Sequence, residues 1–106
     1  MAKYLITGSY TAQGAAGLLK DGGTKRRQIV EELVGGLGGK LESLYFAFGS
    51  DDVVVIVDMP DAAAMTAVSL TVGASGAINI RTTVLITPEE MDAAAKKTVS
   101  YSAPGA

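Results

Sequence analysis

The sequence contains no cysteine and no histidine, and these two absences exclude a large part of catalytic and metal chemistry. Without cysteine the chain has no disulfides and no thiolate ligands for a metal. Without histidine it lacks the commonest general base, the serine–histidine type of triad and the imidazole ligands of haem or zinc. The sequence therefore predicts no metal site and no cofactor.

Positive charge is also scarce, because nine Lys and Arg stand against eleven Asp and Glu. Non-specific nucleic-acid binding needs an excess of positive charge to neutralise phosphates, so we expect no nucleic-acid partner. The longest aliphatic run, residues 53–57, is too short to cross a bilayer, and residues 1–7 do not resemble a signal peptide. We expect a cytoplasmic protein with no membrane partner.

What the sequence does contain is enough hydrophobic residues for one core, 48% of 106 residues. A chain of this length buries about two thirds of its unfolded surface in a single domain. No linker rich in proline or glycine divides the chain. We expect one domain over residues 1–97 and a tail without periodicity over residues 98–106.

Apolar periodicity and capping signals predict an alternation of strands and helices. Pro60 is expected in the first turn of its helix, and residues 87–90 read as a capping box with proline at the first helical position. The predicted order is strand 3–10, helix 11–20, helix 24–37, strand 41–48, strand 52–58, helix 60–74, strand 77–86 and helix 88–97. This is an α+β arrangement, the ferredoxin-like βαββαβ order with an appended C-terminal helix.

Helices would cover one face of this sheet, and the pattern of strand 52–58 indicates that the other face is covered as well. Alternation turns Ile78, Ile80, Val84, Leu44, Phe46 and Phe48 toward the helices. A half-solvated antiparallel strand has polar alternates, whereas residues 53–57 are all Val or Ile, so Val54 and Ile56 would be exposed. A second copy of the domain is the simplest cover, which predicts a homo-oligomer.

Several stretches of the sequence form a set that is typical of one family of small proteins. They are residues 3–11, 14–23, 26–27, 37–41, 45–46 and 52–61. On these stretches the chain resembles the GYD domain family over nearly its whole length. The resemblance implies a ferredoxin-like fold of the dimeric α/β-barrel kind, in agreement with the covered face, and it implies no reaction. The family's Gly, Tyr, Asp signature reads Gly49-Ser50-Asp51-Asp52 here, so Asp51 stands where the tyrosine is expected.

A basic cluster near the start of helix 24–37 is one candidate site. It lies beside glycines and a helix start, where backbone N–H groups can hold a phosphate or carboxylate. The alternative is a solvated face or an ion pair with Glu31 or Glu32. The cluster consists of Lys20, Lys25, Arg26 and Arg27.

A second candidate site lies on the sheet face turned away from the helices. Tyr45 and Arg81 are expected there by alternation, and Asp52 would join them at the start of its strand. Arg81 is expected to be buried and paired with a carboxylate or an anion. The three side chains then line either a ligand cleft or an interface, in which Asp52 pairs with Arg81 or with Arg26 or Arg27.

Two functions remain open on the sequence. The first is a homo-oligomer that binds a small metabolite, an anion being the expected class, in the cleft of Tyr45, Asp52 and Arg81. The second is a cofactor-independent monooxygenase- or isomerase-like enzyme of the dimeric α/β-barrel type, with the same residues moving protons or stabilising charge. The second rests on fold analogy alone.

Overall fold

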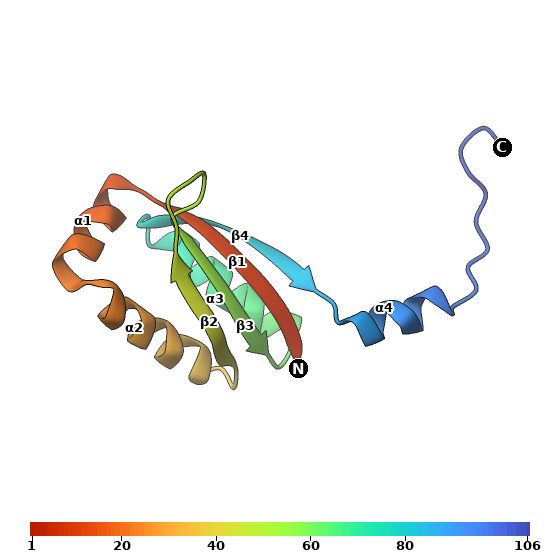
Figure 1. Cartoon of the computed structure of the whole chain (residues 1–106), viewed down its shortest axis with the longest axis horizontal. Helices are drawn as coiled ribbons and strands as arrows, with labels where there is room; N and C mark the ends of the chain where they lie inside the picture. Colours follow the sequence, from red (N-terminus) through yellow and green to blue (C-terminus); the bar gives the residue numbers. More distant parts are fainter.

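The computed structural model covers residues 1–106 and contains one four-stranded antiparallel sheet (Figure 1). The strand order is β2-β3-β1-β4, which is the order of the ferredoxin-like fold. The elements are β1 (Ala2–Tyr10), α1 (Ala12–Asp21), α2 (Gly23–Gly35), β2 (Lys40–Phe46), β3 (Val53–Met59), α3 (Ala62–Ala74), β4 (Ile78–Leu85) and α4 (Pro88–Ala95). The predicted fold class and element order are thus confirmed.

Three predicted helix limits are wrong by about two residues, one of them the end of the C-terminal helix, which was expected at residue 97 and lies at Ala95. The helix expected from Pro60 begins at Ala62, because the Asp61 carboxylate accepts the Ala64 N–H at 2.8 Å and makes Asp61 the N-cap. The helix expected to reach residue 37 ends at Gly35. There the chain turns back through Gly38, whose φ is +80°, a conformation that favours glycine.

The core lies between the sheet and the two longer helices, α2 and α3. Val57 and Met59 of β3 are fully buried, and Val34 of α2 is 1% exposed. Met65 and Val68 of α3 belong to the same buried cluster. The buried residues of β3 are the odd-numbered ones, as the predicted alternation requires.

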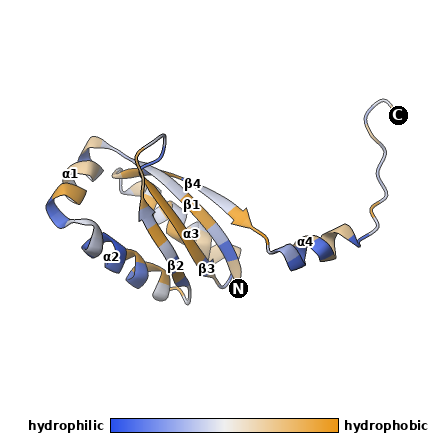
Figure 2. Ribbon diagram, in the orientation of Figure 1, coloured by the Kyte–Doolittle hydropathy of each residue, from blue (hydrophilic) through white to orange (hydrophobic).

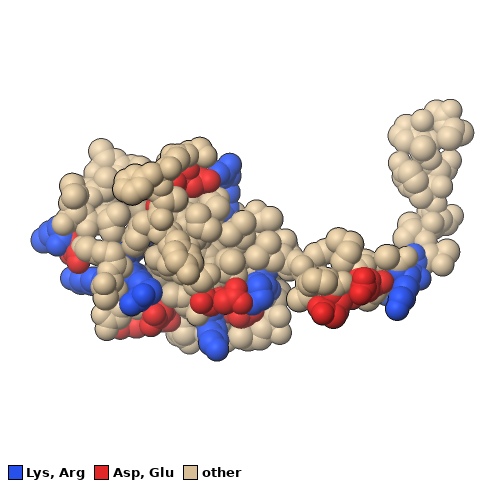
Figure 3. All heavy atoms as spheres, in the orientation of Figure 1, with Lys and Arg blue, Asp and Glu red and all other residues tan.

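The other face of the sheet is covered by no helix, and we call it the open face. Figure 1 looks onto it, with α3 behind the sheet. Figure 2 shows β3 as hydrophobic along most of its length, and Figure 3 shows charged atoms mainly toward the ends of this face. By strand register the open face carries Lys3, Leu5, Thr7, Ser9, Lys40, Ser43, Tyr45, Val54, Ile56, Asp58, Asn79, Arg81, Thr83 and Leu85.

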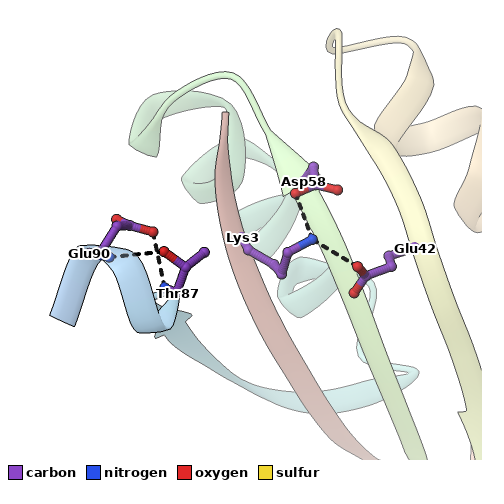
Figure 4. A network of polar contacts seen from close by, with 5 residues as sticks. All are labelled: Lys3, Glu42, Asp58, Thr87 and Glu90. Carbon is purple, nitrogen blue, oxygen red and sulfur yellow. Dashed lines mark hydrogen bonds and ion pairs between the residues drawn. The ribbon is translucent and has the colours of Figure 1, made fainter. Parts of the chain in front are cut away.

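A charged network across three strands lies at one end of the open face (Figure 4). The Lys3 ammonium of β1 lies 2.9 Å from Glu42 of β2 and 3.0 Å from Asp58 of β3. These two hydrogen bonds, to Glu42 and then to Asp58, raise the pKa of Lys3. Polar groups therefore border the apolar residues of this face.

The C-terminal part of the chain leaves the body at the end of β4. Every residue from 86 to 106 is exposed, and in Figure 1 α4 and the tail extend away from the sheet. We call residues 86–106 the arm. None of the helices combines the length and hydrophobicity needed to cross a membrane. The cytoplasmic location and the domain limits at residues 97 and 98 stay predictions.

Candidate functional site

Tyr45, Asp52 and Arg81 do not converge within the single chain, so they form no common cleft there. Tyr45 pairs with Val54, Val54 with Thr7, and Thr7 with Arg81. The row runs across all four strands, and at about 4.8 Å per strand Tyr45 and Arg81 are roughly 14 Å apart. They face the same side, as predicted, but from opposite edges of the sheet.

Arg81 has a carboxylate partner, but the partner is Asp51. One guanidinium nitrogen of Arg81 lies 2.7 and 2.8 Å from the two Asp51 oxygens. The expected burial of Arg81 is wrong for the single chain, where its side chain is 72% exposed. The partner of Arg81 therefore lies in the turn just before β3.

Asp52 points away from Arg81, so the expected ion pair with Arg81 is absent. Its carboxylate accepts the Tyr10 N–H at 2.9 Å, while its own N–H donates to the Gly8 carbonyl at 2.7 Å. Asp52 thus fixes the end of β1. It also lines a hollow of about 340 Å³ between α1 and the β2–β3 loop, whose other residues are Tyr10, Ala15, Leu18, Leu19, Ala47 and Phe48.

Phe48 was expected to face the helices and instead lies fully exposed in that loop. The strand ends at Phe46, and the Ala47 N–H donates to the Asp52 carbonyl across the turn. Alternation therefore no longer applies beyond residue 46. An exposed phenyl ring stands at the rim of the hollow as a result.

The structure brings Arg26 and Asp52 to the same residue, Tyr10, which the sequence could not place on either face. A second hollow of about 150 Å³, here called the Tyr10 hollow, lies on the other side of α1. It is lined by Tyr10, Gln13, Gly14, Gly17, Leu18, Asp21, Arg26 and Ala77. Tyr10 and Arg26 also border a narrow apolar cavity of about 70 Å³ that leads into the core.

Local sequence explains why α1 forms a wall of this hollow. The Thr11 hydroxyl caps α1 by accepting the Gly14 N–H, and it also donates to the Gly76 carbonyl at 2.9 Å. The Thr11 N–H donates to the Ala77 carbonyl at 2.9 Å. Thr11 therefore ties the start of α1 to the loop before β4. Because Gly14 has no side chain, α1 can lie directly against Ala77.

The charges around Tyr10 favour its neutral form overall. Burial of the ring raises the pKa of Tyr10, the Arg26 guanidinium opposes that rise, and the Asp52 carboxylate adds to it. Tyr10 is therefore a hydroxyl donor at neutral pH. Arg26 takes part in none of the ion pairs of the structure, and the one carboxylate of the hollow, Asp21, is 3.6 Å from Lys25.

Arg27 points elsewhere and forms the helix-surface ion pair that the sequence offered as an alternative. It lies 3.9 Å from Glu31, with both side chains 56% exposed. Such a pair contributes less than about 1 kcal/mol. Of the basic cluster, only Arg26 lines the Tyr10 hollow.

The arrangement can hold a small anion. Arg26 supplies a positive charge and paired N–H donors, and the Tyr10 hydroxyl and the Gln13 amide line the same hollow. The cavity beside them is lined by hydrophobic side chains apart from Arg26.

Comparison with known proteins gives a family and a fold. The model of the GYD domain matches residues 4–95. The crystal structure of MtbAldR matches with a TM-score of 0.61 and 17% sequence identity, over 97% of this chain and 57% of that chain. At this identity the match shows the fold alone, and this chain corresponds to little more than half of MtbAldR. No curated protein matches the sequence.

Proposed function

The chain belongs to the GYD domain family, and we propose that it is a homodimeric binding protein for a small organic anion. The anion is a carboxylate attached to a small apolar group. It occupies the Tyr10 hollow, where Arg26 pairs with the carboxylate and Tyr10 donates a hydrogen bond. This places the binding site beside α1 rather than at Tyr45 and Arg81.

The observation that carries the proposal is the guanidinium of Arg26, which lines a hollow without an ion-pair partner. Its neighbour in the sequence, Arg27, has a carboxylate partner and lies on the helix surface. An arginine at a partly buried position is stabilised by an anion that accepts two of its hydrogen bonds. The adjoining apolar cavity supports an organic anion over a bare inorganic one.

The open face supports the homodimer. Leu5, Val54, Ile56 and Leu85 are only partly buried in the single chain, and no helix covers them. Exposed apolar surface of this kind on a small domain marks an interaction site. Two copies related by a twofold axis present the same face to each other, which closes the assembly.

Binding is better supported than the enzyme alternative. A general base must be unprotonated near neutral pH so that it can accept a proton, whereas the raised pKa of Tyr10 keeps its phenol protonated. Of the residues considered for catalysis, Tyr45 and Arg81 lie at opposite edges of the sheet, and the Asp52 carboxylate accepts the Tyr10 N–H. A protonated phenol that shares a hollow with the Arg26 guanidinium suits recognition of a carboxylate.

Native mass spectrometry of the purified protein tests this function first, because a retained anion would be seen as added mass. Titration with benzoate and with inorganic phosphate, followed by amide NMR shifts, then tests the site. We expect benzoate to shift the amides of Tyr10, Gly14 and Arg26. The shifts should vanish in Arg26→Gln and persist in the matched control Arg27→Gln. Equal binding by both variants, or shifts confined to the open face, would contradict the proposed site.

A further inference from the structure

The open face carries two exposed side chains of complementary chemistry, one at each edge of the sheet. Tyr45 on β2 is 71% exposed although it is a large aromatic residue. The side chain of Arg81 on β4 is 72% exposed and faces the same side of the sheet. Because β2 and β4 are the two edge strands, the ring and the guanidinium do not meet within one chain. Both are therefore available to a partner from outside the chain.

Asp51 orients the guanidinium of Arg81. One terminal nitrogen of Arg81 lies 2.7 and 2.8 Å from the two carboxylate oxygens of Asp51. The Asp51 side chain is only 23% exposed, and it comes from the turn before β3. A guanidinium that is bonded at one end keeps its flat faces free, and a planar cation of this kind stacks on the face of an aromatic ring.

A twofold axis parallel to the strands brings the two edges of the open face together. Such an axis, passing between β3 and β1, lays each β2 over the partner's β4 and each β3 over the partner's β1. It leaves positions along the strands unchanged, so each row of paired residues meets the same row of the partner.

Tyr45 and Arg81 belong to one such row, with Val54 and Thr7 between them. Tyr45 of each copy therefore faces the partner's Arg81. Packed sheets lie about 10 Å apart, a distance that these two long side chains bridge from opposite sides.

The neighbouring rows of the open face match in the same orientation. In the next row, Ile56 faces the partner's Leu5, so apolar side chains are buried on each other. In the row at the charged end, Asp58 faces the partner's Lys3, and both residues already form an ion pair within their own chain (Figure 4). Each charge therefore gains a second partner of opposite sign.

A twofold axis across the strands gives a poorer match. Each strand then lies on the same strand of the partner, and the order of the rows is reversed. The row of Lys3 and Asp58 would meet the partner's row of Ser9 and Asn79, which carries no charge on this face. Arg81 would meet the partner's Thr83. The ion pair would lose water without gaining a partner, which costs free energy, so the parallel axis is favoured.

We infer that in the homodimer Tyr45 of each copy packs on the guanidinium of the partner's Arg81, about a twofold axis parallel to the strands. This inference rests on the proposed homodimer and specifies its axis. The contact occurs twice, once at each side of the interface. It brings together two residues that lie at opposite edges of their own sheet, and it covers both.

Thiol crosslinking tests the axis, since the natural chain has no cysteine. Ser43 on β2 and Thr83 on β4 lie in the row next to the contact. In the double variant Ser43→Cys with Thr83→Cys, bis-maleimidoethane should join two chains into a covalent dimer on a denaturing gel. The control Ser43→Cys with Asn79→Cys should not crosslink, because Asn79 lies about 13 Å farther along β4. Each single variant should stay uncrosslinked, whereas an axis across the strands would crosslink Ser43→Cys alone.

A double-mutant cycle tests the contact itself, with the dissociation constant of the dimer measured by sedimentation equilibrium. Tyr45→Leu should raise it about tenfold, because each of the two contacts contributes about half of the 1.4 kcal/mol that a factor of ten represents. Arg81→Met should raise it at least as much, because the Asp51 carboxylate is then left without its partner. In the double variant, Tyr45→Leu should add little to the effect of Arg81→Met.

Arg27→Met provides the matched control for this cycle. Arg27 shares a hollow with Tyr45 in its own chain, but it lies on α2, which packs on the other face of the sheet. It should leave the dissociation constant unchanged, alone or combined with Tyr45→Leu. Coupling of Tyr45 to Arg27 in place of Arg81 would contradict the inference.

Sedimentation of the uncrosslinked natural protein separates failure of the contact from failure of the dimer. A monomer overturns both. A dimer that crosslinks through Ser43→Cys alone, equally through the control pair, or through neither pair overturns the parallel axis and leaves the homodimer. Effects of Tyr45→Leu and Arg81→Met that multiply overturn the contact. A covalent dimer specific to the first pair, together with coupled effects, supports the inference.

Discussion

Replacing Gly14 or Gly17 by alanine provides a sharp test of how α1 is held against the rest of the domain. Both glycines lie inside α1 and both line the Tyr10 hollow. A Cβ on Gly14 would fall inside contact distance of the Ala77 carbonyl oxygen and 3.0 Å from Cδ1 of Tyr10. A Cβ on Gly17 would meet nothing within 4 Å.

Comparison of the two variants isolates the cost of the contact between a Cβ at position 14 and the Ala77 carbonyl. Each substitution gains about 0.5–1 kcal/mol of helix propensity, so that gain cancels between the two variants. The remaining difference is the overpacking cost at Gly14, about 1–3 kcal/mol, and a backbone oxygen yields less readily than a side chain. For a domain of this size, each kcal/mol moves the Tm by roughly 4–8 °C.

Urea and thermal unfolding, followed by circular dichroism at one protein concentration, measure this difference. We expect Gly17→Ala to be slightly more stable than the natural protein and Gly14→Ala to be less stable than Gly17→Ala by the full contact cost. Gly14→Ala should also weaken benzoate binding, because α1 must shift away from Ala77. Equal stability of the two variants would refute the close packing of α1 on Ala77.

Three further predictions concern charged and titrating groups. Spectrophotometric titration should show a tyrosine with a raised pKa that disappears in Tyr10→Phe, and Arg26→Gln should raise that pKa further by removing the positive charge. Lys3→Met should lower the free energy of unfolding, and the difference from the natural protein should be largest below about pH 10, the ordinary pKa of lysine. This difference should shrink as the pH rises through the higher pKa that Lys3 has in the folded protein. Urea unfolding of both proteins at about pH 8 and about pH 11 would measure it. Arg81→Met should cost under about 1 kcal/mol in a monomeric variant, where its pair with Asp51 is exposed, and about 3–5 kcal/mol in a dimer that covers the pair, as comparison of urea unfolding shows.

The fold was predictable because its signals are local in the sequence. The Thr11 cap and the capping box at Thr87 mark their helices through bonds spanning three residues. The assignment of Val54 and Ile56 to the open face follows from the period of two, which any strand obeys. The misplaced helix start at Pro60 has a local cause too, because the neighbouring Asp61 side chain is the cap that forms.

The site was harder to predict because it depends on contacts between distant segments. Tyr10 shares a face with Tyr4 and Ile6 and pairs with Ile78 of β4, and only the fold shows that this face is the one toward the helices. Alternation extended from β3 placed Asp52 on the open face, but β3 begins only at Val53 and the carboxylate turns to Tyr10. For the same reason the partner of Arg81 was missed, since Asp51 lies in the turn just before the strand.

The central claim is that a second copy covers the open face, and sedimentation equilibrium of Val54→Asp beside the natural protein tests it most directly. Val54 lies in the middle of this face, so the variant places one carboxylate from each copy in the interface. Burial of each costs several kcal/mol, and about 1.4 kcal/mol is tenfold in affinity, so the dimer should weaken by at least roughly a thousandfold. At micromolar concentration we predict twice 10.8 kDa for the natural protein and for the control Leu70→Asp, and a folded species of 10.8 kDa for Val54→Asp. A natural protein that sediments only at 10.8 kDa, or a Val54→Asp variant that dimerises as well as the control, would contradict the account.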